Sequence, residues 1–223
     1  MGVNMAKQGI INDRVIRAAA QQEIIRRYFR YRSKRIEGIE LQETVDRMEK
    51  IMAKAKVKIS DRKVVSVARK AAQAAKKKGK GYKGIYCGAA IELPNGKVIS
   101  GKNSPLMHAE SAAILNVAKE LAKIPDEIDL ISSQFISSII FLKKKLLGKK
   151  DLCLNVKEVL IALAMSAPYN PTAEKAMSAL KNLKGCEMHL THIPNEADEY
   201  GLIELGVNFT CDAELALRMY FGN

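Results

Sequence analysis

The spacing of apolar residues changes near residue 84, and this change predicts two kinds of structure in one chain. In the first part, apolar positions recur every three or four residues, as on one face of an amphipathic helix. These stripes fall in residues 24–31, 41–52 and 64–75. They predict three helices, the third of which is capped by Ser60 and runs to about Lys78. From Tyr86 onward, short apolar runs alternate with helical patterns, which predicts a layered α/β fold.

The second part is expected to follow the order β-β-α-β-α-α-α-β-α-β, as a three-layer sandwich of helices on a sheet. Its strands are expected at residues 86–93, 98–101, 127–132, 186–193 and 207–211. Its helices are expected at residues 104–121, 134–147, 159–167, 170–185 and 195–205. Capping residues set the helix starts: Ser104 before Pro105 favours one start, and Asn155 with Glu158 forms a capping box for another.

Charge divides the chain at nearly the same place. The formal net charge is +13; residues 1–83 hold 23 Lys/Arg against 8 Asp/Glu, whereas residues 84–223 hold 14 against 16. We therefore predict a basic helical subdomain at 1–83 and an α/β domain at 84–223. A basic face is typical of nucleic-acid binding, but it also suits a solvated surface or an acidic partner. The sequence contains no helix-turn-helix, Gly-x-x-Gly loop or aromatic RNA-binding motif. Nucleic acid is therefore an alternative and not the expected partner.

Three short helices enclose a thin core, so Tyr28, Phe29 and Tyr31 are expected to pack on another part of the protein or on a second copy in a homo-oligomer. No apolar run approaches the ~20 residues that cross a bilayer, and the first ten residues lack the apolar core of a secretory signal. A cytoplasmic protein without membrane contact is therefore expected. The cysteines form no C-x-x-C pair and are expected to be reduced, buried thiols: Cys87, Cys153, Cys186 and Cys211.

Two stretches carry histidines that could take part in catalysis. His108 and Glu110 lie near the expected start of a helix, where an imidazole and a carboxylate could serve as acid and base. If Ser104 is the N-cap, these two side chains point to different sides, and they converge only if the helix starts later. His189 and His192 lie in an expected strand, whose alternation places them on opposite faces. One of them could join His108 in a pocket; otherwise they are hydrogen-bonded core residues.

A third stretch, Lys102-Asn103-Ser104, leads into the same helix. Helix N-termini favour anions, the lysine adds positive charge, and the other two residues add hydrogen-bond donors. The sequence therefore predicts a small anionic ligand here. The competing interpretation is that Ser104 only caps the helix and Asn103 only turns the chain.

Residues 88–122, GAAIELPNGKVISGKNSPLMHAESAAILNVAKELA, resemble the core of the cytidine-deaminase-like fold, in which a hairpin delivers a His-Ala-Glu to a helix N-terminus. The resemblance implies zinc on one His and two Cys, with the Glu moving protons. The second half of that signature, P-C-x-x-C, would fall near residues 132–137, which read SSQFIS. One His and one Glu cannot complete a tetrahedral zinc site, so no metal ion is expected.

Nearly the whole chain resembles an uncharacterised bacterial family, the "domain of unknown function eighteen forty-six". The resemblance is carried by NMAKQGIINDRVIRAAAQQEIIRRY, EVLIALAMSAPYNPTA and KGCEMHLTHIPNEADEYGLIELGVNFT. It implies that this chain is the C-terminal part of a longer protein, whose missing N-terminal region would be its partner and could hold a nucleotide. No G-x-x-x-x-G-K-[ST] and no cofactor motif occurs in this chain. Some members are labelled ATP-dependent peptidases, but no Ser-His-Asp or H-E-x-x-H pattern supports that label here.

The expected function is therefore a ligand-binding or structural module without a complete zinc site. One alternative is an enzyme that acts on a nucleotide-like or other anionic small molecule through His108 and Glu110 with His189 or His192. The other is nucleic-acid binding through the basic helices.

Overall fold

The computed structural model describes residues 13–216 of the chain. The chain divides into two compact units, Met1–Arg62 and Lys63–Asn223. The division falls before the third helix, whereas the charge pattern placed a boundary after Lys83. Charge reports the solvent-facing side of a helix, but its apolar side decides where the helix packs.

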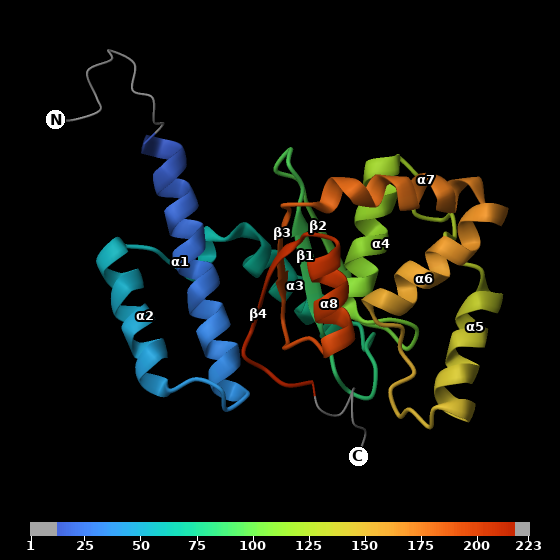
Figure 1. Cartoon of the computed structure of the whole chain (residues 1–223), viewed down its shortest axis with the longest axis horizontal. Helices are drawn as coiled ribbons and strands as arrows, with labels where there is room; N and C mark the ends of the chain where they lie inside the picture. The colour runs from blue at the N-terminus through green and yellow to red at the C-terminus, as the bar shows by residue number, and fades with distance from the viewer. Residues whose placement is uncertain (1–12, 217–223) are drawn as a thin grey trace, which may run out of the picture. The chain divides into compact units, whose positions relative to one another are not determined.

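The first unit contains α1 (Asp13–Ile36) and α2 (Gln42–Ala55), followed by a short 3₁₀ turn, Ile59–Asp61 (Figure 1). Both helices confirm the apolar stripes predicted for this part. The residues that α2 buries are Val45, Met48 and Met52. The helix ends because Lys56 adopts the left-handed conformation, with φ of 54°, and its N–H donates to carbonyls of the last turn.

The second unit is built on a four-stranded open sheet of order β2-β1-β3-β4. β1 is antiparallel to both of its neighbours, and β3 is parallel to β4. The strands are β1 (Gly88–Glu92), β2 (Val98–Lys102), β3 (Glu187–Leu190) and β4 (Asn208–Cys211). This arrangement confirms the mixed α/β class and four of the five expected strands.

Helices cover both faces of this sheet (Figure 1). One face packs on α3 (Lys63–Lys77), and the other on α4 (Ala109–Ala122). Two glycines permit the close approach: a Cβ on Gly88 would lie 2.2 Å from a backbone oxygen of α3, and one on Gly101 would lie 2.2 Å from a backbone nitrogen of α4. The remaining α-helices of the described residues are α5 (Ser133–Phe141), which continues as a π-helical turn at Leu142–Leu146, α6 (Val156–Ser166), α7 (Pro171–Ala179) and α8 (Glu196–Glu204).

The strand expected at residues 127–132 does not form, and this expectation was wrong. Leu130 and Ile131 are buried, but Ser132 is the N-cap of α5, where its hydroxyl accepts from the N–H of Gln134. The segment is therefore the connection into a helix. Its backbone forms turns and pairs with no strand of the described sheet.

The helix expected from Ser104 begins instead at Ala109, with His108 as its N-cap residue. The Ser104 hydroxyl accepts from the N–H groups of Leu106 and Met107, which makes a local turn. Met107 then forms a parallel bridge with Leu154, which holds the chain extended up to His108. Ser60 is likewise inside the 3₁₀ turn and is not the cap of α3.

All four cysteines are buried and free. Within residues 13–216, no helix combines the length and the apolar character that crossing a membrane requires.

Candidate functional site

His108 reaches the interior because α4 starts late. Its backbone N–H donates to Leu154 O over 3.0 Å, and its side chain is fully buried. The imidazole lies between two carboxylates: Nδ1 is 2.6 Å from Asp198 Oδ2, and Nε2 is 3.0 Å from Asp151 Oδ2. The ring is therefore held by contacts from both of its nitrogens.

Each of these carboxylates has a second hydrogen bond that fixes its position. Asp198 lies in the first turn of α8, and its Oδ1 accepts from the N–H of Val156 at 2.7 Å. Asp151 accepts from the N–H of Cys153 at 3.0 Å through its own Oδ1. Both aspartates therefore present their remaining oxygen to His108.

Glu110 lies next to this pair and is also fully buried. Among the described residues, neither of its carboxylate oxygens has a hydrogen-bond partner. The nearby nitrogens are His192 Nε2 at 3.6 Å and His108 Nδ1 at 3.9 Å from Oε1. We call His108, Glu110, Asp151, His192 and Asp198 the acid–base cluster.

The charges of this cluster shift one another's pKa values. Burial lowers the pKa of His108, but the Asp198 charge and the hydrogen bonds to Asp151 and Asp198 outweigh it and raise the pKa to about 10. Burial raises the pKa of Glu110, but the charges of His192 and His108 lower it to about 2. Burial and the neighbouring Glu110 charge raise the pKa of Asp198 to about 7, against the effect of His108. The cluster therefore holds a protonated imidazole between carboxylates.

The structure brings together three of the four catalytic candidates of the sequence. His108, Glu110 and His192 converge, but His189 does not join them. His189 lies on the opposite face of β3, where its Nδ1 is 2.8 Å from Thr210 Oγ1 and its Nε2 is 3.4 Å from Asp212 Oδ1. The strand alternation predicted this separation of the two histidines.

Sequence reasoning missed Asp151 and Asp198. Asp198 follows Asn195, whose side chain accepts from its N–H as the N-cap of α8. An acidic residue at this position is explained by its own helix, so nothing in the sequence indicated a contact with His108. Asp151 precedes Cys153 in a loop and carries no motif at all.

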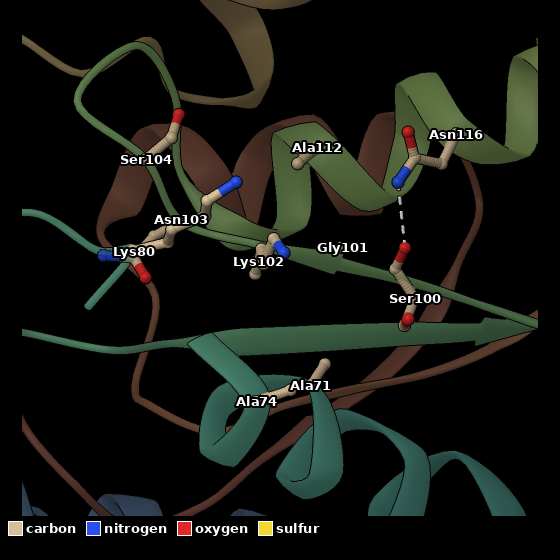
Figure 2. A pocket seen from close by; sticks show the side chains of 10 residues that line it. All are labelled: Ala71, Ala74, Lys80, Ser100, Gly101, Lys102, Asn103, Ser104, Ala112 and Asn116. Carbon is tan, nitrogen blue, oxygen red and sulfur yellow. Dashed lines mark hydrogen bonds between the residues drawn. The ribbon is translucent and has the colours of Figure 1, made fainter. Parts of the chain in front are cut away.

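A pocket of about 440 Å³ borders the outer strand β2 and lies between α3 and α4 (Figure 2). We call it the β2 pocket. Its lining includes Lys80, Lys102, Ser104, Ala112 and Asn116. Its ten lining residues include two lysines and no carboxylate. Asn116 Nδ2 donates to Ser100 O at 2.9 Å, which occupies one outward carbonyl of the edge strand.

The three predicted anion-site residues all line this pocket, but they differ in what they can offer. Lys102 is exposed. The side-chain amide of Asn103 is buried and already hydrogen-bonded within the protein: Oδ1 accepts from Cys87 N at 2.8 Å, and Nδ2 donates to Ile85 O at 3.0 Å. The Ser104 oxygen already accepts two backbone N–H groups, so its own hydroxyl proton can still be donated. Asn103 therefore shapes the pocket, whereas Lys102 and Ser104 retain hydrogen-bond donors that they can offer.

Fold and site together define a mixed α/β protein with an open four-stranded sheet, a buried acid–base cluster and a basic pocket at the sheet edge. The family model described as "Domain of unknown function DUF1846, C-terminal" matches residues 60–221, and the one described as "Domain of unknown function DUF1846, N-terminal" matches residues 1–56. The chain belongs to the DUF1846 family.

Its relatives include two clostridial proteins, each named "UPF0371 protein". The one from Clostridium tetani (strain Massachusetts / E88) is 43% identical over 224 residues, and the one from Clostridium botulinum (strain ATCC 19397 / Type A) is 43% identical over 225 residues. Each match covers 100% of this chain and 44% of the relative. The chain thus spans less than half the length of these relatives.

The expectation that the family's N-terminal region is missing, and acts as a partner of this chain, was wrong. Residues 1–56 match the N-terminal family model, and the alignment to the relatives includes them. The first unit therefore belongs to the N-terminal family domain. Of the three basic helices, α1 and α2 lie in that match, whereas α3 (Lys63–Lys77) lies in the C-terminal one.

Proposed function

We propose that this protein binds a small anionic molecule, of the phosphate-bearing class, in the β2 pocket. The observation that carries the proposal is the charge of the lining, which has two lysines and no acidic residue. In the described part of the chain, the ammonium groups of Lys80 and Lys102 form no ion pair. An anion between them gains charge-assisted hydrogen bonds that no protein group supplies.

The size and the walls of the pocket suit such a ligand. A volume of about 440 Å³ lies within the range of small-molecule sites, roughly 300–1,000 Å³. Ala71, Ala74 and Ala112 provide short apolar walls, against which the uncharged part of a ligand can pack. The Ser104 hydroxyl can donate to an anionic oxygen.

The scaffold that we propose for this pocket is deaminase-like. Support comes from the β1–β2 hairpin, which leads to a helix whose N-cap and first turn read His-Ala-Glu, and from β1 lying antiparallel beside β3. A crystal structure with a different strand order would contradict this part of the proposal.

A second candidate is an enzyme that uses His108, Glu110 and His192, and it is favoured by their convergence. Burial opposes it, because the exposed fractions of these residues are 0%, 0% and 2%. An organic substrate could not reach them unless the cluster opened. Turnover of a nucleotide panel that Glu110→Gln abolishes would support the enzyme; ligand binding in the pocket without turnover would contradict it.

Titration calorimetry and thermal shift with inorganic phosphate, pyrophosphate and AMP test the binding proposal, with chloride at matched ionic strength as the blank. Loss of one charged hydrogen-bond donor costs about 1.5–3 kcal/mol, so Lys102→Ala is expected to weaken binding roughly 10- to 100-fold. Lys80→Ala should act in the same direction. The matched control is Lys175→Ala, an exposed lysine of α7, which should bind as the wild type does.

Two outcomes would contradict the proposal. The first is the absence of heat and of stabilisation with all three anions at millimolar concentration. The second is equal weakening by Lys102→Ala and Lys175→Ala, because this would show that only the overall positive charge matters. Retention of binding in Lys102→Arg would add support, since that variant preserves the charge.

A further inference from the structure

Donor atoms of three residues meet in the interior beside the starts of α4 and α8. His108 is the N-cap residue of α4, Glu110 lies in its first turn, and Asp198 lies in the first turn of α8. One ligand atom from each of the three lies within 4.8 Å of the others, and all three residues are buried. The hydrogen bonding of Glu110 separately points to a ligand at this place.

Glu110 is a fully buried carboxylate, yet its two oxygens have no hydrogen-bond partner among residues 13–216. Burial of a charged group without hydrogen bonds is costly, and in folded proteins such groups are paired or coordinate metals. The imidazole nitrogens near Oε1 lie at 3.6 and 3.9 Å, which is too far for a hydrogen bond. The two imidazoles balance the charge of Glu110 at a distance, but only a bound cation would give its oxygens a direct contact.

Hydrogen bonds to other residues hold His108 and Asp198 so that Nδ1 and Oδ2 lie beside Glu110. Asp151 lies 3.0 Å from His108 Nε2, so this carboxylate can keep the Nε2 proton while an incoming ion displaces the Nδ1 proton to solvent and takes Nδ1 as a ligand. The Val156 N–H occupies Asp198 Oδ1 at 2.7 Å, which leaves Oδ2 facing Nδ1. In metal sites, a ligating imidazole commonly donates its other N–H to a carboxylate, and a ligating carboxylate commonly accepts a further hydrogen bond.

We propose that His108 Nδ1, Glu110 and Asp198 Oδ2 form a binding site for a divalent transition-metal ion of the zinc class. One imidazole and two carboxylates are a donor set of nitrogen and oxygen atoms that suits Zn²⁺, Mn²⁺ or Co²⁺. Ca²⁺ and Mg²⁺ prefer all-oxygen sets. These ligands differ from the His-Cys-Cys set that the deaminase resemblance implies, because carboxylates take the place of the thiolates. The site is separate from the β2 pocket, and neither proposal depends on the other.

The test uses the full chain, stripped with a chelator and then titrated with Zn²⁺ or Co²⁺. We expect one ion per chain by elemental analysis, a rise in the melting temperature with either metal, and a visible d–d absorption band with Co²⁺. Glu110→Gln and Asp198→Asn keep the shape of the side chains and are each expected to weaken metal binding at least about tenfold. Asp151→Asn, which changes only the outer contact, should weaken it by about 10- to 100-fold.

The control is Glu174→Gln, an exposed residue in the first turn of α7, which should bind metal like the wild type. The folded wild type decides the matter even if a cluster variant fails to fold. Substoichiometric metal, with no change of melting temperature and no Co²⁺ band, would overturn the proposal. A Co²⁺ spectrum unchanged in folded Glu110→Gln and Asp198→Asn would overturn it as well, because the ion would then lie elsewhere.

Discussion

Replacement of Asp212 by Asn tests how the sheet is held to α3. Asp212 follows β4, and Arg69 lies on α3; Nη2 and Nε of the arginine donate to the two carboxylate oxygens over 2.6 and 3.0 Å. Exposed ion pairs contribute about 0.2–1 kcal/mol, whereas breaking a buried pair costs about 3–5 kcal/mol. Arg69 is 38% exposed and Asp212 is 14% exposed. We therefore expect Asp212→Asn to lower the free energy of unfolding by about 1–2 kcal/mol, which is roughly 2–8 °C in melting temperature for a chain of this size.

The pH dependence of this loss follows from the pKa of Asp212. Burial raises that pKa, but His189 and Arg69 lower it by more, so in the folded protein it lies well below the ordinary value of 3.8. A depressed pKa stabilises the fold above the pKa of the unfolded chain, and this contribution disappears as the pH falls toward the folded value. The difference between wild type and variant should thus be complete above about pH 5 and shrink below about pH 4.

Thermal melts followed by circular dichroism at several pH values measure both effects. Asp129→Asn is the control, because Asp129 is an exposed aspartate in the loop before α5. A variant as stable as the wild type at pH 7 would refute the role of the ion pair. A difference as large at pH 3 as at pH 7 would refute the charge argument, and would assign the loss to packing.

Two further substitutions test how the edge strand is built. Gly101→Ala places a Cβ 2.2 Å from Ala113 N and 2.6 Å from Ala109 O; since both are backbone atoms, α4 must shift, and we expect a loss of at least about 2 kcal/mol in chemical denaturation. An unchanged denaturation midpoint would show that α4 can shift at little cost in free energy. Asn103→Ala leaves the buried Cys87 N–H and the Ile85 carbonyl without the amide, and we expect it to cost about 2–4 kcal/mol. A loss below about 0.5 kcal/mol would mean that water replaces the amide.

The helix starts that the sequence predicted correctly depend on contacts within a few residues. Asn155 accepts from the N–H of Glu158, and Asn170 and Asn195 cap α7 and α8 in the same way. Each contact joins residues two or three apart, so the local pattern contains all the information. The apolar stripe of α2 was predictable for the same reason, because its spacing alone determines the buried face.

The start of α4 could not be predicted in this way. Ser104 before Pro105 is a good local signal for a helix, but the bridge between Met107 and Leu154 holds the intervening residues extended. That partner lies far along the chain, and no pattern near Ser104 indicates it. The same difficulty applies to the acid–base cluster, in which His108 meets a carboxylate 90 residues later.

The late start of α4 also explains how carboxylates come to be buried in this cluster. Three helices begin around it, since His108 caps α4, Val156 opens α6, and Asp198 lies in the first turn of α8. A helix N-terminus carries roughly half a positive charge and unpaired N–H groups, so it stabilises an ionised carboxylate such as Glu110. Asp198 serves two helices at once, because it accepts the first N–H of α6 through Oδ1 while Oδ2 faces His108. An asparagine at this position can keep the contact with α6 and turn its amino group toward His108. The fold would then remain, and only the charge that a cation requires would be lost.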